Sequence, residues 1–447
     1  MASNASLVVF RIVFGLLMVL ESWGAIATGW VGHTYVEPKL TFPVGGFVEL
    51  RFLSGELMYG YFFVMGLAAL GAMLGWRYRL TSAALAVLWT GAYLGQTDHY
   101  NNHYYLAVLF AWGMALLPAA NRASLDVAAG RQPFRAHTDP WIARAFRIQV
   151  LIVFSYAAIN KLYPGWLNGD YLRVNLGSRG DVWPLGKLVV QEWFQSFTVW
   201  AAILFDAAVI PALWWRRTRV LAFWGLVGFD LFNSLVFRIG IFPYMVIGLT
   251  VFFFSEESIE RAFAWVPGMK APEGVVRGPE PSRAAPRWKL ALLGVYLLIQ
   301  VALPLRHHLY RGDVTWTEEG HRMSWRMMLR TKSARLVLTA MDPKTGKSWA
   351  IDQSELLNKH QQHRVASAPD FLYRYVQDLK ADFRRQGIDP VKIFARYSAC
   401  SLNGARNVPL YDPKADLAQV EWKRFGRNEW VLDQELPKSP SPKTAPK

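Results

Sequence analysis

Apolar segments long enough to cross a lipid bilayer, or nearly so, recur through residues 1–305 of the chain. Backbone N–H and C=O groups in lipid find no water, so they must form hydrogen bonds within their own segment. Each such segment is therefore expected to be a helix. The pattern predicts a mainly α, polytopic transmembrane bundle of about nine helices. Their expected positions are Leu7–Trp23, Leu57–Gly75, Leu80–Gly95, Tyr104–Pro118, Ala143–Ile159, Val199–Trp214, Val220–Val236, Ile241–Phe254 and Lys289–Leu303.

The chain changes character after Arg306, where apolar runs give way to alternating and amphipathic patterns. Alternation at 335–339, a turn at 342–346 and a second short run at 348–351 predict a β-hairpin. An amphipathic helix is expected from Asp370 to Gln386, ended by Gly387, with a further strand at 393–398. We therefore expect a small extramembrane α+β domain over residues 306–436, followed by a disordered Pro/Ser/Lys-rich tail at 437–447.

Arginine and lysine concentrate in alternate loops between the apolar segments, beginning with the loop that holds Arg77 and Arg79. The positive-inside rule places these loops and the N-terminus in the cytoplasm. Everything after Leu303 is then expected on the other side, which is the periplasm in a bacterium and the ER lumen in a eukaryote.

Because Arg11 interrupts the first apolar run and Glu21 follows it, we interpret that run as a retained helix, with a cleaved signal peptide as the alternative.

The net charge of +16 would suit a nucleic-acid-binding protein, but the basic residues form no single stripe. They are spread over short loops, the C-terminal third and the tail, as expected for charges that orient a membrane protein. We therefore expect the lipid bilayer as a partner and no nucleic acid.

The single cysteine, Cys400, excludes an intramolecular disulfide and a cysteine-based metal site.

Lys161 is the first candidate for chemistry, because it follows the apolar run 150–159 with only Asn160 between them. Its position alone favours a lysine that extends its ammonium group to the membrane surface and contributes little to stability. The alternative is an amine held in an apolar, partly dry pocket. Desolvation there disfavours the ammonium form and would leave a neutral base near physiological pH.

Histidines supply two further candidates at the expected outer ends of apolar segments. The first is His103, in the polar run Asn101–His103; several polar groups at one mouth of a bundle indicate function. His99 and His103 are four residues apart, a spacing that also suits a metal pair on a helix, but no acidic residue stands in the usual register and we expect no metal. The second is the pair His307 and His308, where an interface anchor and a site residue fit equally well.

A set of motifs in a fixed order runs through most of the chain. It comprises Asn101–Leu106, Arg147–Gln149, Tyr156–Leu162 with Trp166, Asn233–Ser234, Ile239–Tyr244, Leu303–Pro304, His307, Gly312, Trp316, Ser324–Met328, Asp412–Pro413 and Trp430. With these motifs the chain resembles the vitamin K-dependent gamma-glutamyl carboxylase family. No single motif decides the resemblance, but the ordered set is specific.

The resemblance implies roles for individual residues. The family's lysine at the position of Lys161 is the base that activates the reduced vitamin, and the histidines matching His103 and His307 lie at the active site. We expect these three side chains to converge on one pocket. The expected cofactor contacts are Asn102, Asn233, Phe154 and Tyr156, and the expected contacts to the glutamate substrate are Trp316, Thr317, Glu318, Glu319 and Gly320.

The resemblance also implies the reaction. The cofactor is vitamin K hydroquinone or a related quinol, and oxygen and carbon dioxide are co-substrates. A neutral amine deprotonates the hydroquinone, oxygen adds, and the alkoxide that forms removes a γ-proton from a glutamate residue of a peptide or protein. Carbon dioxide traps the carbanion and the quinone leaves as the epoxide, in a water-poor pocket that the mouth of a bundle supplies.

The chain departs from the family pattern at Phe154, where a tyrosine is expected, and at Asn160, where a second lysine is expected. Its C-terminal region is shorter than that of the animal enzymes, which suggests a bacterial-type homologue. Two alternatives therefore remain: a quinol-binding membrane protein without carboxylase activity, and a non-enzymatic transporter or scaffold. A transporter should carry polar residues near the bilayer midplane on broken, repeated helices, whereas here they gather at one face, which favours the enzyme.

Overall fold

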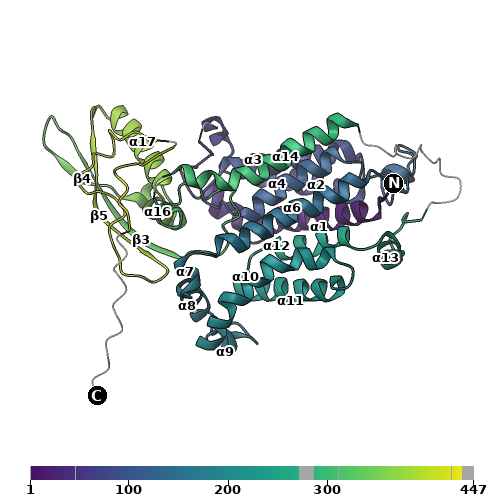
Figure 1. Cartoon of the computed structure of the whole chain (residues 1–447). Helices are drawn as coiled ribbons and strands as arrows, with labels where there is room; N and C mark the ends of the chain where they lie inside the picture. Colours follow the sequence, from purple (N-terminus) through teal and green to yellow (C-terminus); the bar gives the residue numbers. More distant parts are fainter. Residues whose placement is uncertain (1, 46, 271–285, 311, 424, 435–447) are drawn as a thin grey trace, which may run out of the picture. The chain divides into compact units, whose positions relative to one another are not determined.

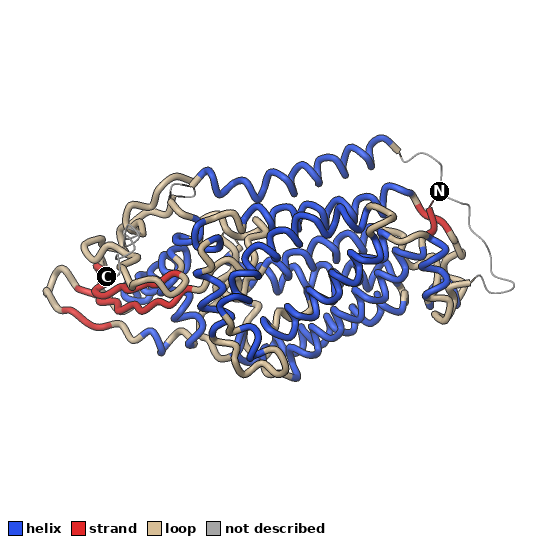
Figure 2. The backbone as a smooth tube through the Cα atoms, turned by 60° about the horizontal axis from the view of Figure 1, so that its bottom comes forward, coloured by secondary structure: helices blue, strands red, loops and turns tan. Residues whose placement is uncertain are grey.

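The computed structural model describes residues 2–45, 47–270, 286–310, 312–423 and 425–434, so the predicted tail at 437–447 lies outside the described residues. The chain forms two compact units. The first comprises Met1–Pro304 with Arg322–Met327, and the second comprises Leu305–His321 with the residues from Met328 onward. Helices make up the first unit almost entirely, whereas the second contains both helices and strands (Figure 2).

Helices occupy all nine positions that the apolar segments predict (Figure 1). Six of them are long and apolar enough to cross a membrane, counting only the described part of the chain: α1, α2, α6, α10, α11 and α14. The predicted count of about nine is higher because it includes α3, the 15-residue α4 and the short α12. The bounds are α1 (Ala5–Ala27), α2 (Leu57–Leu74), α3 (Tyr78–Gly95), α4 (Asn102–Leu116), α6 (Pro140–Asn160), α10 (Glu192–Trp214), α11 (Arg219–Phe237), α12 (Phe242–Leu249) with η3 (Thr250–Phe253), and α14 (Arg287–Leu305).

Short elements connect these helices. A two-stranded ribbon pairs β1 (Ala2–Ser3) with β2 (His137–Thr138). The remaining connections contain η1 (Gly32–Val36), η2 (Val48–Phe52), α5 (Leu125–Ala128), α7 (Pro164–Leu167), α8 (Asp170–Gly177), α9 (Gly186–Val189) and α13 (Glu256–Ala262).

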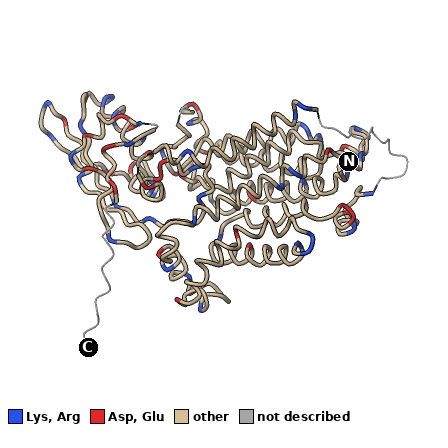
Figure 3. Tube along the Cα trace, in the orientation of Figure 1, with Lys and Arg blue, Asp and Glu red and all other residues tan. Residues whose placement is uncertain are grey.

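Sequential helices pack against one another from α1 to α4, and α12 contacts α1, α6 and α11. Aromatic rings fill the centre of this bundle: Phe146 stacks on Phe252 at a centroid distance of 4.2 Å, and Phe10 contacts both rings. Charged residues are sparse along these helices (Figure 3). One exception is Arg11, which is buried within α1 and donates hydrogen bonds to the carbonyls of Ala119, Arg122 and Ala123. These bonds satisfy the two terminal nitrogens of the arginine that interrupts the first apolar run, whereas its Nε has no hydrogen-bond partner among the described residues.

The arginine-rich loops of the first unit meet at one end of the bundle. Asp126, at α5, accepts hydrogen bonds from the backbone N–H groups of Arg77 and Tyr78, at 2.9 and 2.8 Å. Arg122 forms an ion pair of 2.7 Å with Glu260 of α13. The loops that the charge pattern assigns to one compartment therefore share one end of the bundle, and the assignment of that end to the cytoplasm stays a prediction.

The second unit contains an antiparallel three-stranded sheet in the order β4-β3-β5. The predicted hairpin is present as β3 (Lys332–Met341) and β4 (Ser348–Ala350), and β5 (Lys392–Leu402) is longer than predicted. α16 (Lys359–Ser367) packs on β3, and the amphipathic α17 (Pro369–Arg385) packs on α16. The unit also contains η4 (Arg306–Leu309), α15 (Val314–Thr317) and η5 (Gln353–Glu355).

Candidate functional site

Lys161 caps the C-terminal end of α6, and its side chain is buried, with 8 % exposed. The amine lies 2.5 Å from Oδ2 of Asp206 and donates a hydrogen bond of 3.2 Å to the carbonyl of Ala157. It also lies 5.2 Å from the ring centroid of Trp166, within range of a cation–π contact. The amine is thus held inside the unit by α6, α7 and α10, and does not extend outward as its position alone suggested.

Asp206 is a site residue that the sequence motifs did not indicate. It lies in the middle of α10 with 6 % of its side chain exposed, and a second buried carboxyl group, Asp230 of α11, lies close enough to interact with it electrostatically. Oδ2 of Asp230 has no hydrogen-bond partner among the described residues. An ionisable residue inside an apolar helix is itself a signal of function, and the two aspartates interrupt their apolar runs in the sequence.

Asn160 and Asn102 are connected through the segment 322–327. Asn160 donates a hydrogen bond of 2.9 Å to the carbonyl of Ser324 and accepts one of 3.0 Å from Nη1 of Arg326. Asn102 donates to the carbonyl of Arg326 at 3.1 Å and accepts from the hydroxyl of Tyr100 at 2.8 Å. The end of α6 and the beginning of α4, which are far apart in sequence, are therefore joined by one hydrogen-bonded network next to Lys161.

His103 lies in the first turn of α4 and stacks on Phe242, the first residue of α12, at a centroid distance of 4.2 Å. His99 precedes the helix, because Asn101 is its extended N-cap and accepts a hydrogen bond from the N–H of Tyr104. The spacing of four residues therefore does not place His99 and His103 on one helical face. The geometric premise for a metal pair at these two histidines is wrong.

The three remaining predicted cofactor contacts face different neighbours. Phe154 is buried in the core of the bundle. Tyr156, two residues later on α6, donates its hydroxyl hydrogen to the carbonyl of Val301 of α14. Asn233 is buried near the C-terminal end of α11. Their contact with one common ligand stays a prediction.

A cavity of about 240 Å³ lies beside the loop that follows Lys161. Its walls come from α7, α8 and the first half of α10, and include Asn168, Arg173, Gln195 and Trp200. Val199 lines it as well, and the carbonyl of Val199 accepts a hydrogen bond of 3.1 Å from the indole N–H of Trp166. The same indole therefore contacts Lys161 and the wall of this cavity.

A second, aromatic-lined cavity between α2 and α4 measures about 20 Å³, room for roughly one water molecule.

His307 belongs to the second unit, in η4, where its ring packs against that of His308 with centroids 4.0 Å apart. Gly320 adopts a left-handed conformation, with φ of 74°. A Cβ at this position would lie 2.9 Å from Cα of His307 and 3.0 Å from the ring of Tyr310. The close approach of the two segments therefore requires glycine. The predicted convergence of His307 with His103 and Lys161 stays a prediction.

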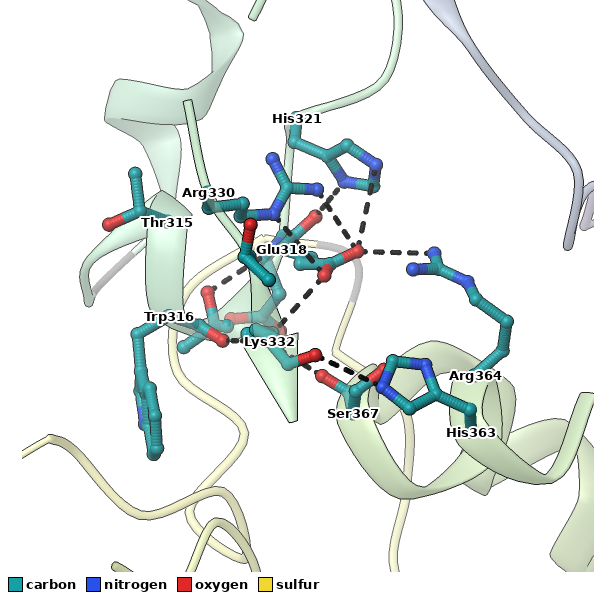
Figure 4. Close-up of polar contacts among 12 residues, drawn as sticks. Thr315, Trp316, Glu318, His321, Arg330, Lys332, His363, Arg364 and Ser367 are labelled. Carbon is teal, nitrogen blue, oxygen red and sulfur yellow. Dashed lines mark hydrogen bonds and ion pairs between the residues drawn. The ribbon is translucent and has the colours of Figure 1, made fainter. Parts of the chain in front are cut away.

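Glu318 lies at the centre of a charged network in the second unit (Figure 4). Arg330 and Arg364 approach its Oε2 at 3.1 Å each, and Lys332 approaches Oε1 at 3.6 Å. Burial alone would raise the pKa of Glu318, but these cations outweigh it and hold the pKa well below its usual range. Burial lowers the pKa of Lys332, although Glu318 opposes this shift. The carboxylate thus compensates part of the positive charge of three basic side chains.

Three other predicted substrate contacts, Trp316, Thr317 and Glu319, are also buried within the second unit. Trp316 donates its indole N–H to the carbonyl of Leu432 at 2.9 Å, and its own carbonyl accepts a hydrogen bond from Lys332. Glu319 accepts a hydrogen bond of 2.6 Å from Asn428. Burial raises the pKa of Glu319 above its usual value, although the Asn428 bond opposes the rise. These side chains of the segment 316–320 serve contacts inside their own unit.

The fold and this geometry define a multi-pass membrane protein with a polar cluster at the end of a helical bundle and a small α+β unit. Comparison with protein families gives two matches: the HTTM domain over residues 1–257, and the vitamin K-dependent gamma-carboxylase lumenal domain over residues 285–436. The chain therefore belongs to the vitamin K-dependent gamma-carboxylase family, as its motifs suggested. No solved structure matches it.

Proposed function

We propose that this protein is a membrane enzyme that oxygenates a quinol at Lys161 and couples this reaction to carboxylation of peptidyl glutamate. The observation that carries the proposal is the buried amine of Lys161. A neutral amine has two N–H groups, and the carbonyl of Ala157 and the carboxylate of Asp206 can accept both. Its lone pair is then free to accept a proton from a quinol hydroxyl group.

The residues around Lys161 suit a quinol head group. Trp166 offers an aromatic wall next to the amine, and the cavity of about 240 Å³ borders the same residue through Val199. The lining of this cavity combines the apolar side chains of Leu167, Val199 and Trp200 with polar ones such as Arg173 and Gln195. When bound, the reduced quinol supplies, together with oxygen, a base strong enough to remove a glutamate γ-proton.

The chain's own residues have three tasks in this proposal. Lys161 accepts the quinol proton at Nζ, and Trp166 covers the amine and keeps water from it. Asn160 and Asn102 hold the ends of α6 and α4 on the segment 322–327, so that the helix end that carries Lys161 keeps its position. A rigid support of this kind reduces the cost of orienting the reacting groups.

The test is an assay of the purified full chain in lipid nanodiscs. The reaction contains vitamin K hydroquinone, oxygen, labelled bicarbonate and a glutamate-containing peptide, and the epoxide and the labelled peptide are scored separately. We expect both products from the wild-type protein and neither from Lys161→Met, which keeps an apolar side chain of similar length. Absence of epoxide from the wild-type protein would contradict the proposal.

One observation favours a second candidate, quinol oxygenation without carboxylation. The side chains of Trp316, Glu318 and Glu319 are buried and bonded within their own unit, which leaves them little freedom to receive a glutamate side chain. In the assay above, epoxide without labelled peptide would select this candidate.

A further inference from the structure

The pair formed by Lys161 and Asp206 joins the end of α6 to the middle of α10, 45 residues further along the chain. Both side chains are buried, with 8 % and 6 % exposed. When the amine carries an extra proton, the two charges in such surroundings lose their hydration, which stabilising contacts must offset. A buried pair of this kind is therefore weak support for stability alone, and its position at the proposed base suggests a role in the reaction.

We propose that Asp206 is the positioning residue of Lys161 and stabilises the ammonium group that forms when Lys161 accepts a proton. The inference rests on the proposed function for its catalytic meaning. Before the transfer, Asp206 and the carbonyl of Ala157 accept the two N–H bonds of the neutral amine and orient its lone pair. During the transfer, a new N–H bond forms as the quinol O–H bond breaks, and the electron pair of that bond stays on the oxygen.

The positive charge produced at Nζ then lies 2.5 Å from the carboxylate of Asp206. Opposite charges at this distance interact strongly when water is excluded, so the carboxylate lowers the free energy of the ammonium product. In this way Asp206 assists the proton transfer to Lys161 without touching the quinol. The aspartate of a serine protease acts in a comparable way on its histidine.

Each element packed around Lys161 contributes one group to its surroundings. α10 contributes Asp206, and Asp230 of α11 lies close enough to Asp206 to interact with it electrostatically. α7 contributes the ring of Trp166, and α6 contributes the carbonyl of Ala157. Arg326 bonds to the neighbouring Asn160. Of these groups, Asp206 is the carboxylate in contact with the amine, so its removal should change the behaviour of Lys161 most.

The first test uses Asp206→Asn, which keeps an oxygen acceptor for the amine but removes the charge. We expect kcat for epoxide formation to fall about a hundredfold, a usual contribution for groups that assist proton transfer. KM for the quinol should stay nearly unchanged, because Asp206 is not placed in contact with it. Asp206→Glu keeps the carboxylate and should recover part of the lost turnover. A merely structural role would instead make Asp206→Asn and Asp206→Glu equally poor.

The second test does not depend on turnover. 1-Fluoro-2,4-dinitrobenzene reacts with an amine only when the amine is neutral, and peptide mass spectrometry gives the labelling rate of Lys161 as a function of pH in the folded full chain. Without the neighbouring carboxylate the ammonium form is less stable, so in Asp206→Asn the midpoint of labelling should move about one to three units to lower pH. An unchanged midpoint overturns the proposal.

The matched control is Glu260→Gln, which removes the carboxylate of the ion pair with Arg122 in the same unit, among the arginine-rich loops. Neither epoxide formation nor the labelling midpoint of Lys161 should change in this variant. If the wild-type protein forms no epoxide, the proposed function fails, and the labelling experiment still decides whether Asp206 stabilises the ammonium form of Lys161.

Discussion

Replacement of Glu318 by glutamine should destabilise the second unit strongly. The side chain of Glu318 is 3 % exposed, and those of Lys332, Arg330 and Arg364 are 3, 14 and 16 % exposed. Glutamine keeps the shape of the side chain but removes its charge. Among the described residues of this network, Glu318 is the carboxylate that pairs with all three cations. Loss of one partner from a buried ion pair costs about 3–5 kcal/mol, because the remaining charge stays desolvated and uncompensated.

Hydrogen–deuterium exchange of the full chain in nanodiscs measures this change locally. Amides of β3 and β5 exchange through opening of the second unit, so their rates report its free energy of unfolding. Since about 1.4 kcal/mol corresponds to a factor of ten, the expected loss accelerates exchange by about two to three and a half orders of magnitude. The matched control is Glu429→Gln, in the exposed pair with Lys423, which should leave the rates unchanged.

The same network predicts the sign of a pH effect. The folded pKa of Glu318 lies well below its usual range, so its contribution to stability is fully present above the unfolded pKa of about 4.3. This contribution is lost as the pH falls from there through the folded pKa. Exchange of the β3 amides should therefore accelerate on acidification in the wild type, and less so in Glu318→Gln. Equal exchange rates in Glu318→Gln and Glu429→Gln at pH 7 would refute the reasoning.

Three further predictions concern function, topology and backbone geometry. Lys161→Ala should abolish quinol oxidation, and an added small amine should partly restore it; full activity in this variant would remove Lys161 from the mechanism. Reporter fusions after Arg79 and after Leu303 should report opposite compartments, and the same compartment for both would overturn the topology. Gly320→Ala should lower the stability of the second unit by about 1–3 kcal/mol, since its φ is 74° and the new Cβ meets His307 at 2.9 Å; an unchanged midpoint of thermal unfolding would contradict this.

The positions of the helices could be predicted from the sequence because each apolar run carries its own signal. The hairpin and α17 were likewise predictable, since alternation and amphipathic spacing are local patterns. The partners of site residues were not predictable in this way. Lys161 follows an apolar run and was expected to contribute little to stability as a helix-end residue. Its contact with Asp206 lies across 45 residues and contradicts that expectation, because removal of the amine leaves a buried carboxylate without its partner.

The family pattern has a lysine where this chain has Asn160, and the hydrogen bonds around Asn160 give a physical explanation for this difference. Its side chain accepts a hydrogen bond from the guanidinium group of Arg326 and donates one to the carbonyl of Ser324. Both the acceptor oxygen and the donor nitrogen of the amide are therefore used. A lysine at this position could donate but could not accept, and its ammonium group would face the guanidinium at close range. Asn160 and Arg326 are therefore a matched pair in this chain. Since position 160 is an asparagine, Lys161 is the one lysine at the end of α6. Asp206 is the carboxylate in contact with its amine.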